Sequence, residues 1–245
     1  MNSTSHYPVA PLKYLSFCII LFCLLPSVVT AQKEATNWYF GNHAGLRFHD
    51  DKPEVVYDGQ LSTGEGCATI SDPVTGALLF YTDGNSVWNW KHKVMANGDL
   101  LFGGEGTSTQ AALIIPYPGH RNWYYLFTTG NTSTPPYHPG LYYNVIDMSK
   151  KQGEGEVIRK NIRLLDSAGE KLTATYHCNG KDWWVVSHSW KKNIFYSFRV
   201  TSEVVESAIQ STVGKIEKEN GDIVFGMGYM RFSPDGKKLA MAVYT

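Results

Sequence analysis

Short runs of apolar and aromatic residues, separated by clusters of Gly, Asn, Asp and Pro, follow one another along the chain after residue 32. Four stretches each form a pair of such runs around a glycine-containing turn: residues 67–83, 111–129, 172–189 and 229–245. Runs rich in Val, Ile, Tyr, Phe and Trp and bounded by turn residues are typical of β-strands. The 3.6-residue apolar period of a helix is almost absent. The pattern therefore predicts an all-β protein built from hairpins.

The hairpins resemble one another and recur at a roughly regular interval. Their turn glycines are 43, 61 and 56 residues apart: Gly76, Gly119, Gly180 and Gly236. The second and third hairpins are each followed by a further apolar run and a more polar one: 141–149 with 156–164, and 194–202 with 208–216. Four strands repeated in this way predict a β-propeller of four-stranded antiparallel blades, in which neighbouring sheets stack to cover their faces.

The number of repeats predicts an incomplete propeller. Complete blades are expected to begin near Ser62, Thr107 and Glu170, and a last blade near Met227 ends after one hairpin. Residues 38–49 predict a partial first blade without its own first hairpin. Closed propellers have about 4–8 blades, so we expect the chain to be the front part of a longer protein, truncated within a blade. A β-sandwich is the alternative, although it does not predict similarity at a fixed period.

The first 31 residues have a different pattern. A nearly continuous apolar run from Leu15 to Val29 follows Lys13 and ends at the small residues Thr30 and Ala31. These are the features of a cleaved secretory signal peptide, which predicts a secreted or cell-surface protein with a single propeller domain in residues 32–245. Because the apolar run is shorter than the roughly 20 residues of a spanning helix, we expect no membrane span after signal removal.

Composition and charge narrow the classes of function. Apolar residues make up 43% of the chain and charged residues 18%, which excludes a disordered protein. The 22 basic and 22 acidic residues cancel, so the sequence has no electrostatic signal for binding nucleic acid. Cys67 and Cys178 remain in the exported region, where either a disulfide or two free thiols would be stable.

Several segments resemble a family of exported bacterial surface proteins. Residues 37–49, 65–89, 108–119 and 170–189 look like the amino-terminal WD-repeat-like propeller of proteins exported by the type IX secretion route and associated with gliding motility. Residues 229–236 are similar to the core of a TolB-type propeller repeat. The resemblance implies a non-enzymatic propeller at the bacterial surface. It also implies further modules and a C-terminal sorting domain that engages the secretion machinery, which this sequence lacks.

Three polar residues that precede first strands of the repeats are candidate site residues. Glu65, Gln110 and Glu170 stand five or six positions before Ile70, Ile115 and Tyr176. The first strand of a propeller blade lines the axis, so we expect these side chains at one mouth of the central channel. Their oxygens suit a hard cation such as Ca²⁺ or a sugar. Alternatively, they bond to the backbone of the adjoining blade, as repeated positions in repeat proteins usually do.

Aromatic residues give a second candidate surface. Trp90, Trp123 and Tyr137, the last within the proline-rich loop of residues 128–140, are candidates for a rim that stacks on a glycan or contacts a protein partner. The alternative for such residues is packing between blades, because adjacent side chains in a strand point to opposite faces.

Catalytic and metal motifs are weak in this sequence. The acidic turns at Asp72, Asp83 and Asp235 lack the spacing of a calcium loop, and no two histidines have a zinc-ligand spacing. We therefore predict no metal and no cofactor, with Ca²⁺ at the channel mouth as the one exception considered. A glycoside hydrolase or lyase with carboxylates at the mouth, and a purely structural spacer, remain alternatives. The sequence favours a non-enzymatic module that binds protein or glycan.

Overall fold

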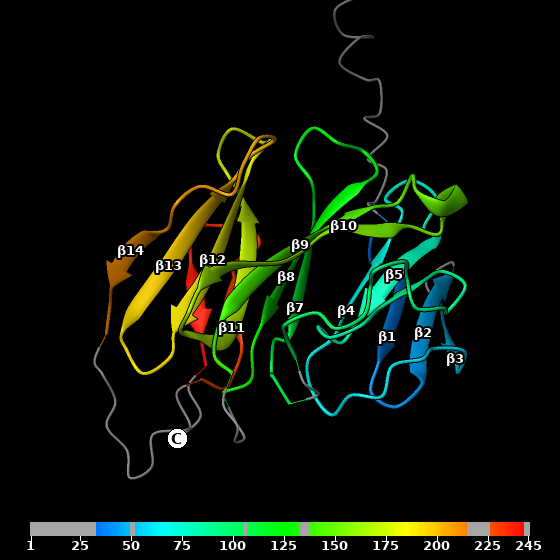
Figure 1. Ribbon diagram of the computed structural model, residues 1–245, viewed down its shortest axis with the longest axis horizontal. Helices are drawn as coiled ribbons and strands as arrows, with labels where there is room; N and C mark the ends of the chain where they lie inside the picture. Colours follow the sequence, from blue (N-terminus) through cyan, green and yellow to red (C-terminus); the bar gives the residue numbers. More distant parts are fainter. Residues whose placement is uncertain (1–32, 50–51, 105–106, 133–137, 215–225, 243–245) are drawn as a thin grey trace, which may run out of the picture. The chain divides into compact units, whose positions relative to one another are not determined.

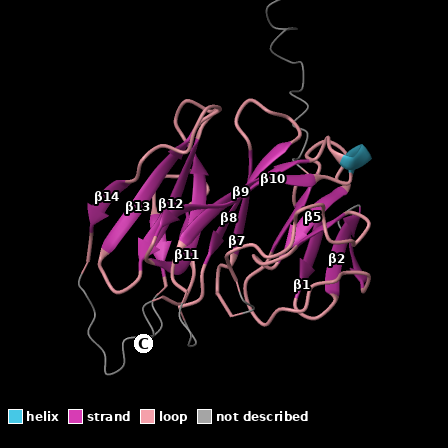
Figure 2. Cartoon of the chain, in the orientation of Figure 1, coloured by secondary structure: helices cyan, strands magenta, loops and turns pink. Residues whose placement is uncertain are grey.

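The computed structural model describes residues 33–49, 52–104, 107–132, 138–214 and 226–242. This part of the chain is all-β, with sixteen strands in five antiparallel sheets and one 3-10 turn at Lys151–Gly153 (Figure 2). The predicted signal peptide lies outside the described residues. Within the described ranges, no helix has the length and apolar character to span a membrane.

The five sheets follow one another in chain order, and within each sheet consecutive strands are neighbours (Figure 1). The first two sheets have three strands each: β1 (Asn37–Phe40), β2 (Ala44–His49) and β3 (Lys52–Val56), then β4 (Ala68–Ser71), β5 (Leu78–Thr82) and β6 (Val87–Asn89). The third sheet has four: β7 (Ala112–Pro116), β8 (Trp123–Thr129), β9 (Leu141–Asp147) and β10 (Glu156–Leu165). The fourth also has four: β11 (Ala168–Tyr176), β12 (Trp183–Ser189), β13 (Ile194–Val200) and β14 (Ile209–Thr212). The last sheet is the hairpin of β15 (Met230–Phe232) and β16 (Leu239–Met241).

The predicted hairpins are confirmed, but the predicted count of three four-stranded units is wrong. The unit that begins near Ser62 has three strands, because the chain folds back on β6 where a fourth strand was expected. The side-chain oxygen of Asn89 accepts hydrogen bonds from the backbone of Lys91 and Lys93. The backbone beyond has positive φ at His92 (58°) and Asn97 (56°), which interrupts an extended strand. The described strands do not form a closed propeller.

Four strands that begin successive sheets lie side by side and run in the same direction. The backbone N–H of Gly66, before β4, donates to Ser108 O, before β7 (3.0 Å). Thr109, also before β7, donates from its backbone N–H to the Glu170 carboxylate in β11 (2.9 Å). The backbone N–H of Glu170 in turn donates to Gly226 O, before β15 (3.0 Å). The starts of β4, β7, β11 and β15 are therefore at a common end, which we call the starting end.

Strand β1 lies against β4 but runs in the opposite direction. Asn37 donates from its backbone N–H to Ser71 Oγ (3.2 Å), and Tyr39 donates to Thr69 Oγ1 (3.0 Å). The two strands are therefore antiparallel. The strand of the first sheet that lies against β4 thus has the direction of a second strand, as expected if residues 38–49 lack a first strand of their own.

The apolar core consists of three clusters, and each lies between two successive sheets. Tyr39 and Tyr81 join the first and second sheets, with ring centroids 4.6 Å apart. Neighbouring positions of β8 contribute to the other two clusters. Leu126 packs toward the second sheet, and Phe127 packs toward the fourth. Because alternate residues of a strand point to opposite faces, the third sheet is covered on both faces. Four successive sheets with a core between each pair are not the two layers of a sandwich.

Candidate functional site

Glu170 is fully buried at the starting end, where its carboxylate joins two sheets. Its Oε2 accepts from the backbone N–H and the hydroxyl of Thr109 (2.9 and 3.0 Å). Its Oε1 accepts from the backbone N–H and the hydroxyl of Thr132 (3.2 and 2.7 Å). Hydrogen bonds to a charged acceptor are stronger than neutral ones, so these four contacts hold β11 to the loops that flank β7 and β8.

Gln110 has a similar position and joins three sheets. Its Oε1 accepts from the backbone N–H groups of Leu172 in β11 (3.2 Å) and Met230 in β15 (2.7 Å). Its Nε2 donates to the carbonyl of Met230 (3.3 Å). The sequence analysis gave two alternatives for this residue, a ligand site or a bond to the backbone of the adjoining unit. The contacts of Gln110 are of the second kind.

Glu65 differs from the other two residues because it is exposed. Partial burial and the negative charge of Glu170 raise the pKa of its carboxyl group above the usual value. The structure thus brings Glu65, Gln110 and Glu170 to the same end. A calcium ion at this end would have to compete with the four donors that already occupy Glu170. In the described ranges, no group of three or more His, Cys, Asp or Glu residues has the arrangement of a metal site.

A buried lysine lies directly beside Glu170. The ammonium group of Lys171 donates to the carbonyl of Met227, before β15. Burial lowers the pKa of Lys171 to about 8, although the charge of Glu170 acts in the opposite direction. Burial and the positive charge of Lys171 also lower the pKa of His188 in β12. The sequence analysis missed this lysine, since a charged residue within a strand usually faces solvent.

The three acidic turns use their aspartates within the turn itself. Asp72 Oδ1 accepts from the backbone of Val74 (3.0 Å) and Thr75 (2.7 Å). Asp83 and Asp235 make the same kind of contact to backbone N–H groups two residues further on (2.9 and 3.1 Å). This is the usual role of Asp in tight turns and agrees with the spacing, which is not that of a calcium loop.

The aromatic candidates have different surroundings. Trp90 has 44% of its surface exposed, and its Nε1 donates to Gly153 O (3.0 Å). Trp123 is partly buried, in contrast to the prediction. Its ring stacks on His120 (4.6 Å between centroids) and meets Tyr117 edge-on (5.4 Å), as part of the core between the third and fourth sheets. Tyr137 lies outside the described residues.

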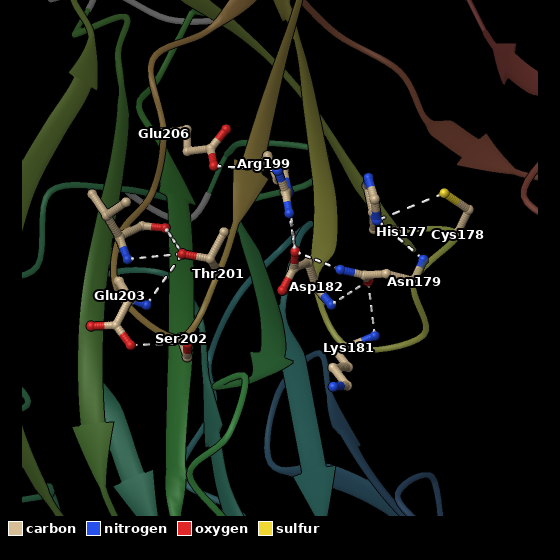
Figure 3. Close-up of polar contacts among 11 residues, drawn as sticks. His177, Cys178, Asn179, Lys181, Asp182, Arg199, Thr201, Ser202, Glu203 and Glu206 are labelled. Atoms are coloured by element: carbon tan, nitrogen blue, oxygen red, sulfur yellow. Dashed lines mark hydrogen bonds and ion pairs between the residues drawn. The ribbon is translucent and has the colours of Figure 1, made fainter.

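A network of polar side chains ties the β11–β12 turn to β13 (Figure 3). Asp182 Oδ2 accepts two hydrogen bonds from the guanidinium group of Arg199 (2.7 and 3.0 Å) and a third from Asn179 Nδ2 (2.8 Å). Arg199 also contacts Glu206 at 3.6 Å. The hydrogen bonds from Arg199 hold the pKa of Asp182 below its usual value. All these groups are paired with one another, which indicates a role in fixing the turn.

Cys67 and Cys178 are both free thiols. Cys67 is partly buried, where its Sγ donates to Tyr39 O (3.4 Å), and Cys178 is exposed in the β11–β12 turn. Of the two alternatives left open by the sequence, the structure has the unbridged one.

A recess of about 330 Å³ lies at the opposite end of β4 and β7 from Glu65. Its walls come from the β4–β5 and β7–β8 turns and from the segment before β1, and include Glu34, Ile70, Pro73, Pro116, Arg121 and Tyr124. Sequence reasoning missed this site because its walls come from three segments far apart in the chain and no motif marks them.

Comparisons with known proteins identify no relative: no protein-family model matches the chain, and no curated protein or solved structure is significantly similar to it. The resemblance to propellers of the type IX route therefore stays a prediction.

Proposed function

We propose that residues 32–245 are part of a β-propeller that acts outside the cell as a non-enzymatic binding scaffold, with its connecting turns presented to a protein or glycan. The observation that carries this proposal is the packing of β8, whose neighbouring residues Leu126 and Phe127 enter separate cores. Similar sheets that stack in chain order, with β4, β7, β11 and β15 parallel, are what radial stacking predicts.

The state of the carboxylates supports binding over hydrolysis. A general acid or base has to reach the substrate, and a glycoside hydrolase uses two such carboxyl groups. Glu170 is fully buried and its two oxygens already accept four hydrogen bonds from Thr109 and Thr132. Of the two predicted carboxylates, Glu65 is the exposed one.

The location outside the cell rests on the sequence. The apolar run from Leu15 to Val29 and the small residues before Gln32 support export through a cleaved signal. On this proposal, retention at the bacterial surface would use the type IX machinery.

Purified residues 32–245 should bind a surface protein or glycan without turning it over. We would incubate them with polysaccharides and with extracts of bacterial surfaces, and measure both capture and the release of reducing ends. Turnover that Glu65→Gln abolishes, with Glu203→Gln in an exposed turn as the matched control, would establish the hydrolase instead. Glu65→Gln removes an exposed carboxylate and should leave the fold intact. Failure to capture any surface protein or glycan would favour the spacer.

A further inference from the structure

We propose that the recess between the β4–β5 and β7–β8 turns is a carbohydrate-binding site. This inference rests on the proposed binding function and assigns it a place and a ligand class. The recess has a volume of about 330 Å³, at the lower end of the roughly 300–1,000 Å³ of small-molecule sites. That size suits a sugar ring or a short oligosaccharide end.

The main evidence is the hydroxyl group of Tyr124, on β8. The side chain is only 5% exposed, and its ring meets Phe80 edge-on with centroids 5.5 Å apart. The hydroxyl makes no hydrogen bond to any residue in the described part of the chain, although it lies in the wall of the recess. The hydroxyl is not one of the fully buried polar atoms without a partner, so it is open to the recess and available to a ligand. A ligand hydroxyl in the recess would provide that partner.

Two charged side chains of opposite sign accompany Tyr124 in the wall. Glu34 is fixed through its backbone, because its carbonyl accepts from Ser71 N (2.9 Å) at the end of β4. Arg121 belongs to the β7–β8 turn. Neither side chain makes a hydrogen bond or ion pair with the described residues. The wall therefore provides a carboxylate acceptor, guanidinium donors and a hydroxyl that does both.

The charges of the wall, together with the nearby Asp72, favour a neutral ligand. Burial and the carboxylates of Asp72 and Glu34 raise the pKa of Tyr124 to about 12, while Arg121 acts in the opposite direction. An anion would be attracted by Arg121 but repelled by these two carboxylates. A cation would be attracted by the carboxylates but repelled by Arg121. A neutral polyhydroxyl compound avoids both repulsions and can bond to all three groups.

The remaining wall is apolar and suits the C–H faces of a sugar. Ile70, Pro73 and Pro116 contribute aliphatic surface. The ring of His120 also lines the recess and is held against Trp123, at 4.6 Å between centroids. Sugars combine hydroxyl edges with apolar faces, so a small site with convergent polar groups and a fixed ring matches them better than it matches a peptide, which needs a longer groove.

A larger recess of about 650 Å³, between the first sheet and the β4–β5 turn, fits a ligand less well. Two of its polar side chains, Asn37 and Arg47, already have protein partners. Arg47 donates to Asn37 Oδ1 (3.1 Å), and Asn37 Nδ2 donates to Ser71 Oγ and to Gly76 O (3.0 and 2.9 Å). Binding there would have to break these contacts, whereas the Tyr124 recess has groups without partners.

The test is calorimetric titration of residues 32–245 with neutral sugars: glucose, galactose, mannose, N-acetylglucosamine and their disaccharides. We expect saturable binding of at least one sugar below about 10 mM. Tyr124→Phe should weaken it about 5- to 10-fold, the loss expected for one hydrogen bond, with an unchanged melting temperature. Glu34→Gln and Arg121→Gln should weaken it to a similar degree. Tyr57→Phe, which removes a hydroxyl from a side chain that is 79% exposed, is the matched control and should bind as the unchanged protein does.

The outcomes separate this inference from the proposed function. No sugar binding, or binding that Tyr124→Phe and Glu34→Gln leave unchanged, would overturn the assignment of the recess. If the protein then still captured a surface protein, the binding scaffold would stand without a sugar site. If a disaccharide were cleaved, with Glu65→Gln abolishing cleavage, the non-enzymatic function itself would be wrong.

Discussion

At the scale of single residues, polar side chains at the starting end join neighbouring sheets. Glu170 accepts hydrogen bonds from the third sheet's flanking loops, and its neighbour Lys171 donates to Met227 before the last sheet. Gln110 bonds to both β11 and β15. Removing one partner of a buried charged contact usually costs more than the contact contributes, so each of these residues is sensitive to substitution.

Lys171 should make the stability depend on pH in an uncommon direction. Its pKa is about 8 in the folded protein, against 10.5 for an ordinary lysine, so the unfolded chain binds more protons between these values. The free energy of unfolding should therefore rise with pH in this window, by about 2 kcal/mol from pH 8 to pH 10. Below pH 8 the cost of burying the ammonium group is fully present, despite the nearby Glu170.

Urea unfolding at several pH values would measure this effect. Other groups titrate in the same range, including Cys67, so the quantity to compare is the difference between the unchanged protein and Lys171→Met. We expect the difference in unfolding free energy to change with pH above 8 and to be constant below it. A difference that is constant from pH 6 to pH 10 would contradict the role of Lys171.

At the scale of elements, β8 is the strand on which the layered packing depends. Leu126 and Phe127 are both fully buried, although their side chains point to opposite faces of the same sheet. In a sheet with one exposed face, one of two neighbouring positions would tolerate truncation. Here each of them fills a separate core.

Truncation of either side chain should therefore destabilise the protein. We expect Leu126→Ala to lower the free energy of unfolding by about 2–5 kcal/mol and Phe127→Ala by about 3–5 kcal/mol. Ile209→Ala in β14, whose side chain is 57% exposed, should change it by about 1 kcal/mol or less. Chemical denaturation measures all three. A small effect of either β8 variant would mean that one face of the third sheet is open.

The hairpins could be predicted from sequence because apolar runs and turn glycines are local signals. The loss of a fourth strand after β6 could not, since it follows from hydrogen bonds of Asn89 and from positive φ values, for which His92 and Asn97 give only weak signals. That Glu65, Gln110 and Glu170 lie at one end could be predicted, because they have equivalent positions in the repeat. The Tyr124 recess did not, because Glu34 and Tyr124 are brought together by packing between segments that no repeat relates.

At the scale of the whole molecule, each core lies between two successive sheets, so a sheet is stabilised mainly by its immediate neighbours. The first and second sheets share Tyr39 and Tyr81, and the third and fourth share Phe127 and Phe198. In such an arrangement stability is close to a sum of local terms, and a defect need not spread.

Tyr39→Ala should therefore act locally. We expect faster amide hydrogen exchange in β1, β2 and β5, and unchanged exchange in β12 and β13, where Val185 and Phe198 are buried in another core. Hydrogen exchange read by mass spectrometry distinguishes these regions. Equal acceleration in β12 would show that the sheets unfold as one cooperative unit.

Adjacent positions of β11 reach in different directions, the carboxylate toward one neighbour and the ammonium group toward the other. An insertion or deletion of one residue at this point would present each neighbour with the wrong charge. These contacts therefore fix the position of β11 along its two neighbours. Strand β14, with all four residues exposed, has no comparable constraint. Length variation among natural or engineered versions of this protein should accumulate at the outer strands and be selected against at positions 170 and 171.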